Sequence, residues 1–308
     1  MAKRPTWYKP DIQLSVRMFI TMLLLGVVYT AFILILWNLG VNFILLLVIA
    51  AIILGVQLFF ADKIALFSMN AREVTPEEAP QLHALIDRLA AQANLPKPKV
   101  AIVNTNLPNA FATGRSKKHA VIAVTTGLLD HLNTQELEAV LAHELTHIIN
   151  RDMVVMTIAM FISMVASLIV NSFMWGAFYG GYGGRRDNRD GGGNAFVLAL
   201  LVALVVQAIS FVLIRTLSRY REYAADRGSA LITGEPGNLA SALMRIEGTI
   251  ESGRIPDRDL RQAQGVSALM IMPALRGENV MELFSTHPSL EHRVERLQNM
   301  QKQMETPR

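Results

Sequence analysis

The sequence contains no cysteine and few charged residues. Without cysteine there is no disulfide, no cysteine-ligated zinc finger and no cysteine nucleophile, so any metal ion must be bound by histidines and carboxylates. Charged residues make up 18% of the 308 residues and hydrophobic residues 52%, whereas about a quarter of the residues of a typical soluble domain are charged. The formal net charge of +4 is small, and no basic stripe alternates with aromatic residues. The composition therefore excludes a disordered chain and argues against nucleic acid binding.

Charge is missing altogether from long stretches of the chain. Met18 to Phe60 contains no Asp, Glu, Lys or Arg, which corresponds to about 65 Å of helix, or about twice the hydrocarbon core of a bilayer. The polar residues 37–40 divide this stretch into two. Together with two later apolar blocks, the pattern predicts four membrane-spanning helices, at about 18–37, 41–60, 153–178 and 195–214. Buried helices of a soluble core would give a similar pattern, more readily for the second pair than for the first.

The basic residues predict an orientation and a division into domains. Four basic residues precede the first span, whereas the turn of the first hairpin has none. By the positive-inside rule the N-terminus lies in the cytoplasm, and two hairpins return the C-terminus to the same side. The three arginines in the glycine-rich loop 180–193 fit an external position poorly. We expect an N-terminal transmembrane hairpin at 1–60, a second transmembrane hairpin at 153–214, and a cytoplasmic domain formed by 61–152 and 215–308.

The cytoplasmic segments carry signals for helices and a few strands. Thr75 and Glu78 have the spacing of a capping box and predict a helix that runs to Ala93, and Asn133 and Glu136 predict a helix that runs to Asn150 or beyond. Strand patterns cover 100–103, 109–114 and 119–125. Further helices are expected at 215–233, 238–253, 258–275 and 288–304.

The sharpest motif is His143-Glu144-Leu145-Thr146-His147, an HExxH pattern in a predicted helix. Residues four apart lie on one face of a helix, about 6 Å from each other, so His143 and His147 can both bind one Zn²⁺ at about 2.0–2.1 Å. Glu144 lies about 100° further round the helix, where it can reach a water molecule on the metal without binding the metal itself. Zinc lowers the pKa of that water to about 7, and Glu144 can take its proton as general base. The motif predicts a zinc hydrolase, with a chance match in an ordinary helix as the alternative.

Two histidines leave a metal site incomplete, and a later acidic pair can supply the missing carboxylate. Glu222 and Asp226 again lie four apart on a predicted helix. We expect Glu222 to be the third zinc ligand and Asp226 to accept a hydrogen bond from the outer ring nitrogen of His143, which fixes the tautomer of that ring. Because arginines flank the pair, it also fits a solvated acidic face.

Both motifs lie close to the second hydrophobic hairpin. His147 precedes the third apolar block by six residues, about 9 Å along a continuous helix, and Glu222 follows the fourth block by eight residues, about 12 Å. If the two blocks form a hairpin, both ligand-bearing helices emerge from the same face of the membrane. The zinc ion then lies at the cytoplasmic surface, where a protease meets membrane-associated substrates.

These features resemble the HtpX-like membrane zinc metalloproteases, which are related to the CAAX prenyl proteases and to the mitochondrial quality-control protease. The resemblance covers most of the chain. HExxH alone occurs in many metalloproteases, whereas HExxH followed by ExxxD after a hydrophobic hairpin is much more specific. Besides that hairpin, the matching segments are Asn109-Ala110-Phe111-Ala112-Thr113-Gly114, Thr126-Gly127-Leu128-Leu129, Ala142 to His147, Glu222-Tyr223-Ala224-Ala225-Asp226, and Ser285-Thr286-His287-Pro288 with Arg293.

The resemblance implies a gluzincin-type metalloprotease with one Zn²⁺ per chain, bound by His143, His147 and Glu222, and with Glu144 as general base. It also implies cleavage of membrane or misfolded proteins on the cytoplasmic side of a prokaryotic plasma membrane, in protein quality control and stress response. We therefore expect an α+β, mainly helical integral membrane protein with about four transmembrane helices. Its expected partners are polypeptide substrates and the lipid bilayer, and not nucleic acid.

Further candidate residues lie outside the metal site. The segment Asn109, Ala110, Phe111 and Ala112 can form an edge strand that pairs with an extended substrate, although an internal strand fits the pattern equally well. His287 can donate a hydrogen bond to the oxyanion that forms when water attacks the peptide carbonyl. Arg293 can hold His287 or a substrate carboxylate. A loop or helix-surface position is the alternative for both His287 and Arg293.

Three other functions compete with a quality-control endopeptidase. A membrane-bound scaffold with an inactive zinc site has no need of Glu144, which is present. A transporter predicts ionisable residues inside the spans, and the four spans have none beyond their ends. A CAAX-type processing protease is the nearest alternative enzyme, and it normally has more spans around a chamber.

Overall fold

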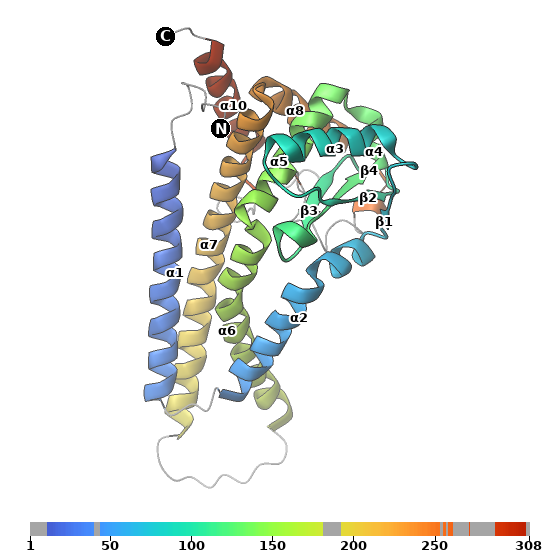
Figure 1. Cartoon of the computed structure of the whole chain (residues 1–308). Helices are drawn as coiled ribbons and strands as arrows, with labels where there is room; N and C mark the ends of the chain where they lie inside the picture. Colours follow the sequence, from blue (N-terminus) through green and yellow to red (C-terminus); the bar gives the residue numbers. More distant parts are fainter. Residues whose placement is uncertain are drawn as a thin grey trace.

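The computed structural model describes residues 11–39, 44–180, 192–252, 255–256, 258–260, 271 and 287–305. Long helices form a bundle, and a small sheet covered by shorter helices sits at one end of it (Figure 1). The bundle contains α1 (Ile12–Asn38), α2 (Ile44–Ser68), α6 (Asp152–Gly180) and α7 (Gly192–Thr233). The start of α1 and the last helix, α10 (Leu290–Glu305), lie at the same end as the sheet, where Arg296 forms an ion pair with Asp11 at 3.2 Å.

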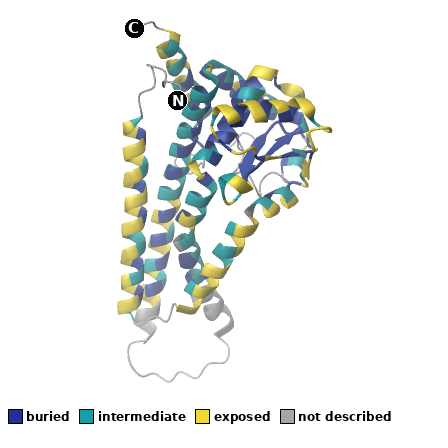
Figure 2. Cartoon of the chain, viewed as in Figure 1, coloured by how far each residue is buried: buried dark blue, intermediate teal, exposed yellow. Residues whose placement is uncertain are grey.

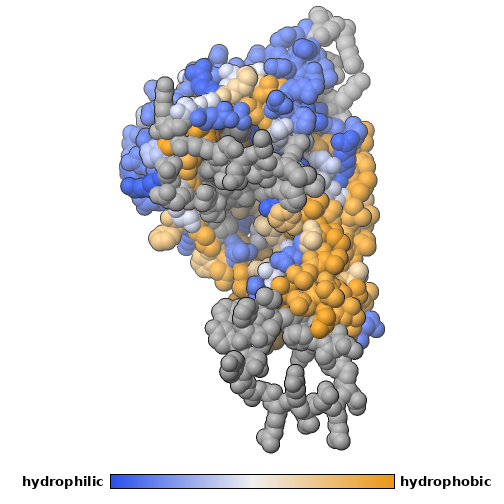
Figure 3. All heavy atoms as spheres, turned by 180° about the vertical axis from the view of Figure 1, so that it is seen from behind, coloured by the Kyte–Doolittle hydropathy of each residue, from blue (hydrophilic) through white to orange (hydrophobic). Residues whose placement is uncertain are grey.

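The bundle has the length and surface of a membrane domain. Among the described residues, three segments are long and apolar enough to cross a bilayer, at Ile12–Asn38, Asp152–Asn171 and Val197–Thr233. Helix α2 makes a fourth if its two parts, which are bent by 73° around residue 61, count as one span. Large apolar side chains are exposed along the bundle, whereas the domain above it is mostly hydrophilic (Figures 2 and 3). Because water would disfavour so large an apolar surface, this part of the chain lies in a membrane.

Small residues allow the membrane helices to pack closely. Ala166 of α6 and Ala199 and Ala203 of α7 are fully buried against Phe32 and Leu36 of α1. Alanine lets helix backbones approach, which is the main source of packing energy where water is absent. The two transmembrane hairpins expected from the sequence therefore form one bundle in which α7 contacts both α1 and α6.

In the part of the chain that the structure describes, the sheet has four strands in the order β1-β2-β4-β3. Strand β2 runs parallel to β4, and the outer pairs are antiparallel. The three expected strands are confirmed, and the short β1 is added to them. Strand β3 lies at an edge of the sheet, which decides between the edge and internal positions considered above. The strands are β1 (Arg72–Glu73), β2 (Lys99–Val103), β3 (Ala110–Thr113) and β4 (Val121–Thr125).

The helices of this domain differ from expectation at two points. Helix α3 begins at Pro80 and not at Thr75: the Glu78 carboxylate does accept a hydrogen bond from the Thr75 amide, but the chain turns between them and the helix follows with proline in its first turn. The helix expected at 258–275 does not run through Ile271, which lies in a bend. The other helices are α3 (Pro80–Gln92), a 3₁₀ turn (Lys117–His119), α4 (Thr126–His131), α5 (Thr134–Asn150) and α8 (Pro236–Glu251).

Helix α5, which carries the HExxH motif, is separated from the membrane helix α6. Its expected capping box is confirmed, because Asn133 and Glu136 exchange side chain to main chain hydrogen bonds. The helix ends at Asn150, as one of the two expected ends, but the continuous course assumed between His147 and the third span is wrong: Arg151 has a left-handed conformation with φ of 56°, which ends α5 before α6 begins at Asp152. By contrast, α7 runs unbroken from its apolar part through Glu222 to Thr233.

Helices α5 and α7 cross at very close range. A Cβ atom added to Gly228 of α7 would lie only 2.3 Å from the side chain of Thr146 on α5. One residue further along α7, the Ser229 hydroxyl donates to the Ala139 carbonyl at 2.7 Å. Glycine is therefore required at this crossing, which sets the distance between the helix that carries two histidines and the helix that carries the carboxylates.

Candidate metal centre

Two histidines of α5 and a glutamate of α7 converge on one point. The ligand atoms of His143, His147 and Glu222 all lie within 4.8 Å of one another. The two Nε2 atoms are 3.1 Å apart, and the Glu222 carboxylate oxygens lie 3.6 Å from His143 Nε2 and 3.5 Å from His147 Nε2. Two imidazole nitrogens that face each other at this distance need a cation or proton between them. The set of two nitrogens and one carboxylate suits zinc, so the chain's residues fit such an ion.

The electrostatics of the two histidines differ. Burial alone would lower the pKa of His143, but the carboxylates of Asp226 and Glu222 raise it to about 9. Burial lowers the pKa of His147 to about 4. Without a metal, His143 therefore keeps a proton that a bound metal ion would displace, as metal binding to histidine generally requires.

Glu144 lies beside the ligands but is not one of them. It is fully buried, and its carboxylate is surrounded by the imidazoles of His143 and His147, the Glu222 carboxylate and the main-chain amide of Ala112. Burial raises its pKa above the usual value for glutamate. A buried carboxylate with a raised pKa can take and return a proton, which is the property of a general base.

A buried ion pair, Asp226 with Arg293, lies on the Nδ1 side of the His143 ring. The Asp226 carboxylate lies 3.0 Å from His143 Nδ1. Asp226 in turn accepts two hydrogen bonds from Arg293 of α10, at 3.0 Å from Nε and 2.6 Å from Nη2. Arg293 also lies 3.5 Å from Glu222. It is fully buried beside the metal ligands, so the helix-surface alternative for this residue is wrong.

His147 has a matching arrangement that sequence reasoning missed. The Asp152 carboxylate lies 2.6 Å from His147 Nδ1. Arg221 of α7 binds Asp152 twice, through the carboxylate at 2.5 Å and through the main-chain carbonyl at 2.7 Å. Asp152 comes within reach because the chain turns at Arg151, where α5 ends. The available signal was an aspartate five residues after the second histidine and an arginine directly before Glu222.

The remaining candidates lie on two sides of the ligands. His287 is buried with Nδ1 3.4 Å from the Glu222 carboxylate. The main-chain carbonyl of Ala110 points away from β4, because it accepts a hydrogen bond from Ile271 at 3.2 Å. Main-chain directions alternate along a strand, so Ala112 also faces outward, whereas the main chain of Phe111 faces β4 and its side chain is buried in the core. Asn109 is buried directly before the strand.

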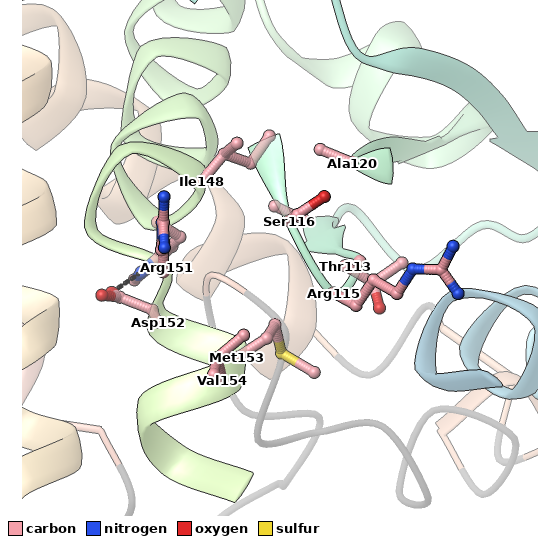
Figure 4. Close-up of a pocket in the computed structure, with 12 residues that line it drawn as sticks. Thr113, Arg115, Ser116, Ala120, Ile148, Arg151, Asp152, Met153 and Val154 are labelled. Atoms are coloured by element: carbon pink, nitrogen blue, oxygen red, sulfur yellow. Dashed lines mark hydrogen bonds and ion pairs between the residues drawn. The ribbon is translucent and has the colours of Figure 1, made fainter. Parts of the chain in front are cut away.

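A small cleft continues from this edge strand toward the membrane helices (Figure 4). Its walls are the end of β3 and the junction of α5 with α6. His147 lies at the cleft, and Met153 and Val154 at the start of α6 also line it. An extended chain along β3 would therefore pass a metal ligand and then reach the first turn of a membrane helix.

Comparison with known proteins places this site in a family. The model of Peptidase family M48 matches residues 76–301. The chain is 56% identical to a Protease HtpX homolog of Moorella thermoacetica, over 97% of this chain and 98% of that protein. It is 51% identical to Protease HtpX homolog 2 of Methanosarcina acetivorans, over 96% and 98% of the two chains.

A solved structure shows a related fold. The crystal structure of S. mikatae Ste24p matches with a TM-score of 0.54 at 18% identity, over 93% of this chain and 67% of that one. At this identity the likeness concerns the fold alone. The family match covers most of the chain, the relatives are proteases, and the apolar helices belong in a membrane. The chain therefore belongs to peptidase family M48 and is a membrane metalloprotease.

Proposed function

We propose that this protein is a zinc endopeptidase that cleaves membrane or misfolded proteins at the cytoplasmic face of a prokaryotic plasma membrane, in protein quality control. One zinc ion per chain is held by His143, His147 and Glu222. The observation that carries the proposal is that α7 bears both an apolar span and Glu222 without interruption. Such a helix holds the site close to the bilayer, where segments of membrane proteins become accessible.

The chain's residues divide the chemistry among them. A bound zinc ion supplies Lewis acidity, which makes water acidic enough to lose a proton near neutral pH. Glu144 takes that proton and later returns it to the leaving amine. His287, buried beside Glu222, donates to the oxyanion that develops on the peptide carbonyl. The outward main-chain groups of β3 bind the substrate as an added strand, and Asn109 and Arg293 hold its main chain.

Cleavage assays test the reaction. The detergent-purified chain is stripped with chelator, reloaded with Zn²⁺ and mixed with a model membrane protein or an unfolded soluble protein, beside the Glu144→Gln variant. We expect zinc-dependent cleavage by the unsubstituted chain alone, with equal zinc content in both. Equal cleavage by both proteins would refute the role of Glu144. Absence of cleavage by either, with one zinc per chain, would favour the scaffold function.

The orientation has a direct test because the chain has no cysteine. Single cysteines at Lys118, in the turn between β3 and β4, and at Glu305, at the end of α10, report on the domain. A membrane-impermeant maleimide should label both positions in inverted vesicles and neither in intact cells. Labelling of either position in intact cells would place the domain outside. The start of α1 lies at the same end of the bundle (Figure 1), so the N-terminal side should follow the domain.

A further inference from the structure

One residue of the chain itself lies where a substrate strand would bind. The amide of Ile271 donates to the main-chain carbonyl of Ala110 at 3.2 Å and to Oδ1 of Asn109 at 3.0 Å. Ala110 is the outward-facing residue at the start of the edge strand β3. Ile271 therefore takes up the main-chain acceptor that an added strand would use first.

The other polar group of the Ile271 main chain is held from the opposite side. Its carbonyl accepts a hydrogen bond from Arg293 Nη1 at 2.8 Å. The same guanidinium binds Asp226 behind His143 and lies 3.5 Å from Glu222. The amide of this one residue is thus satisfied at the start of the edge strand, and its carbonyl by an arginine beside a metal ligand. That is what a binding site for the main chain of a substrate residue requires.

The surroundings of the Ile271 side chain indicate which substrate side chains this site would prefer. Ile271 is 1% exposed and belongs to the apolar core cluster that also contains Ala110 and Ile250. A space that accepts isoleucine among such neighbours disfavours charged side chains, because burying an unpaired charge is costly. It also favours larger aliphatic side chains over alanine, since each buried methylene strengthens binding.

We infer that Ile271 occupies a subsite of the substrate, as an intramolecular competitor. A substrate residue replaces it, binding its amide to Ala110 and Asn109, its carbonyl to Arg293, and an aliphatic side chain in the space that Ile271 vacates. The inference rests on the proposed function, because it assigns this edge of β3 to a polypeptide substrate. It narrows the substrate class to extended segments with isoleucine, leucine or valine at this subsite.

Binding measured without turnover separates this inference from the proposed function. Zinc-loaded full-length chain carrying Glu144→Gln is titrated in detergent with fluorescent peptides that differ at one position, which holds Ile, Ala, Asp or Lys. Fluorescence anisotropy gives the dissociation constants. We expect the Ile peptide to bind at least about tenfold more tightly than the Ala peptide, the discrimination typical of an apolar pocket, and the Asp and Lys peptides to bind most weakly.

The competitor itself is tested by substitution in the same background. Ile271→Pro removes the amide that donates to Ala110 and Asn109, and should tighten binding of the Ile peptide several-fold. Ile250→Ala is the matched control, because Ile250 is equally buried in the same cluster but its main chain belongs to α8. It should leave the binding constant unchanged. Thermal unfolding confirms that both variants fold.

The outcomes are distinct. Ile271→Ala should act in the same direction as Ile271→Pro, and it applies where the proline variant does not fold. Unchanged or weaker binding in both variants would make Ile271 a permanent wall of the site and overturn the inference, as would equal binding of all peptides or binding of none. Failure of the unsubstituted, zinc-loaded chain to cleave peptides that it binds would refute the protease mechanism and leave the subsite standing.

Discussion

Replacing Asp152 with alanine should weaken zinc binding through His147. The Asp152 carboxylate lies 2.6 Å from Nδ1 of His147, so it fixes the tautomer that presents Nε2 to the metal. Loss of such a partner typically lowers metal affinity about 10- to 100-fold, or by about 1.4 to 2.7 kcal/mol. Arg221 is 4% exposed and binds this carboxylate at 2.5 Å. Removing the partner of a buried charge should also cost about 3 to 5 kcal/mol of folding free energy.

A double variant separates the loss of zinc affinity from the loss of folding stability. Asp152→Ala combined with Arg221→Met removes both buried charges, and such replacements are often neutral for stability. We expect the double variant to recover its melting temperature but not its zinc affinity. Asp87→Ala is the control, because Asp87 forms an exposed ion pair with Lys97 and such pairs contribute little.

The assay is competition for Zn²⁺ with a chromophoric chelator, with thermal unfolding followed in parallel. A zinc affinity of Asp152→Ala within about twofold of the unsubstituted chain would refute the reasoning, because the effect expected for an orienting carboxylate is at least about tenfold. Recovery of zinc affinity in the double variant would also refute the orienting role of Asp152, since it would show that the loss of affinity came only from the unpaired Arg221.

Three further predictions concern α7. Glu222→Ala should abolish tight zinc binding and cleavage together, because it removes one of three protein ligands; full zinc occupancy by elemental analysis would remove Glu222 from the ligand set. Asp226→Ala should lower zinc affinity about 10- to 100-fold, and an unchanged affinity in the chelator assay would contradict its role behind His143. Gly228→Ala should lower the free energy of unfolding by about 1 to 3 kcal/mol, because the added methyl group overpacks against Thr146. Gly248→Ala is the control and should be neutral or stabilising, because no atom lies within 4 Å of the added methyl group. Equal melting temperatures of the two variants would show that the crossing tolerates a methyl group.

The sequence predicted the parts of the site that depend on local spacing. His143, Glu144 and His147 share a helix whose capping box is also legible, and residues four apart lie on one face whatever the rest of the fold does. Glu222 and Asp226 follow from the same rule on α7. For this reason the sequence alone points to the three metal-binding candidates, whose ligand atoms lie within 4.8 Å of one another.

The parts that the sequence did not predict depend on single dihedral angles and on distant contacts. A positive φ at an arginine is uncommon, so nothing in the sequence revealed that the chain turns at Arg151 and brings Asp152 back to His147. The bend in α2 lies around residue 61, directly after the predicted span 41–60, and no pattern in the sequence predicts that the helix continues beyond it. Ile271 and Asn109 are 162 positions apart in the chain, and no local pattern predicts contacts over such a separation.

Because α7 is unbroken, the thickness of the bilayer influences the position of Glu222 in the active site. When hydrophobic mismatch changes the tilt of a spanning helix, α7 carries the movement to Glu222 without interruption, whereas the turn at Arg151 separates α6 from the helix that bears His147. Glu222 lies about 24 Å along the helix from Val206 in the apolar part, so a tilt of about 5° around that residue moves it about 2 Å. This displacement equals a whole zinc–ligand bond of about 2 Å. The ion pair between Arg221 and Asp152, which lies beside His147 and directly before Glu222, opposes such a displacement.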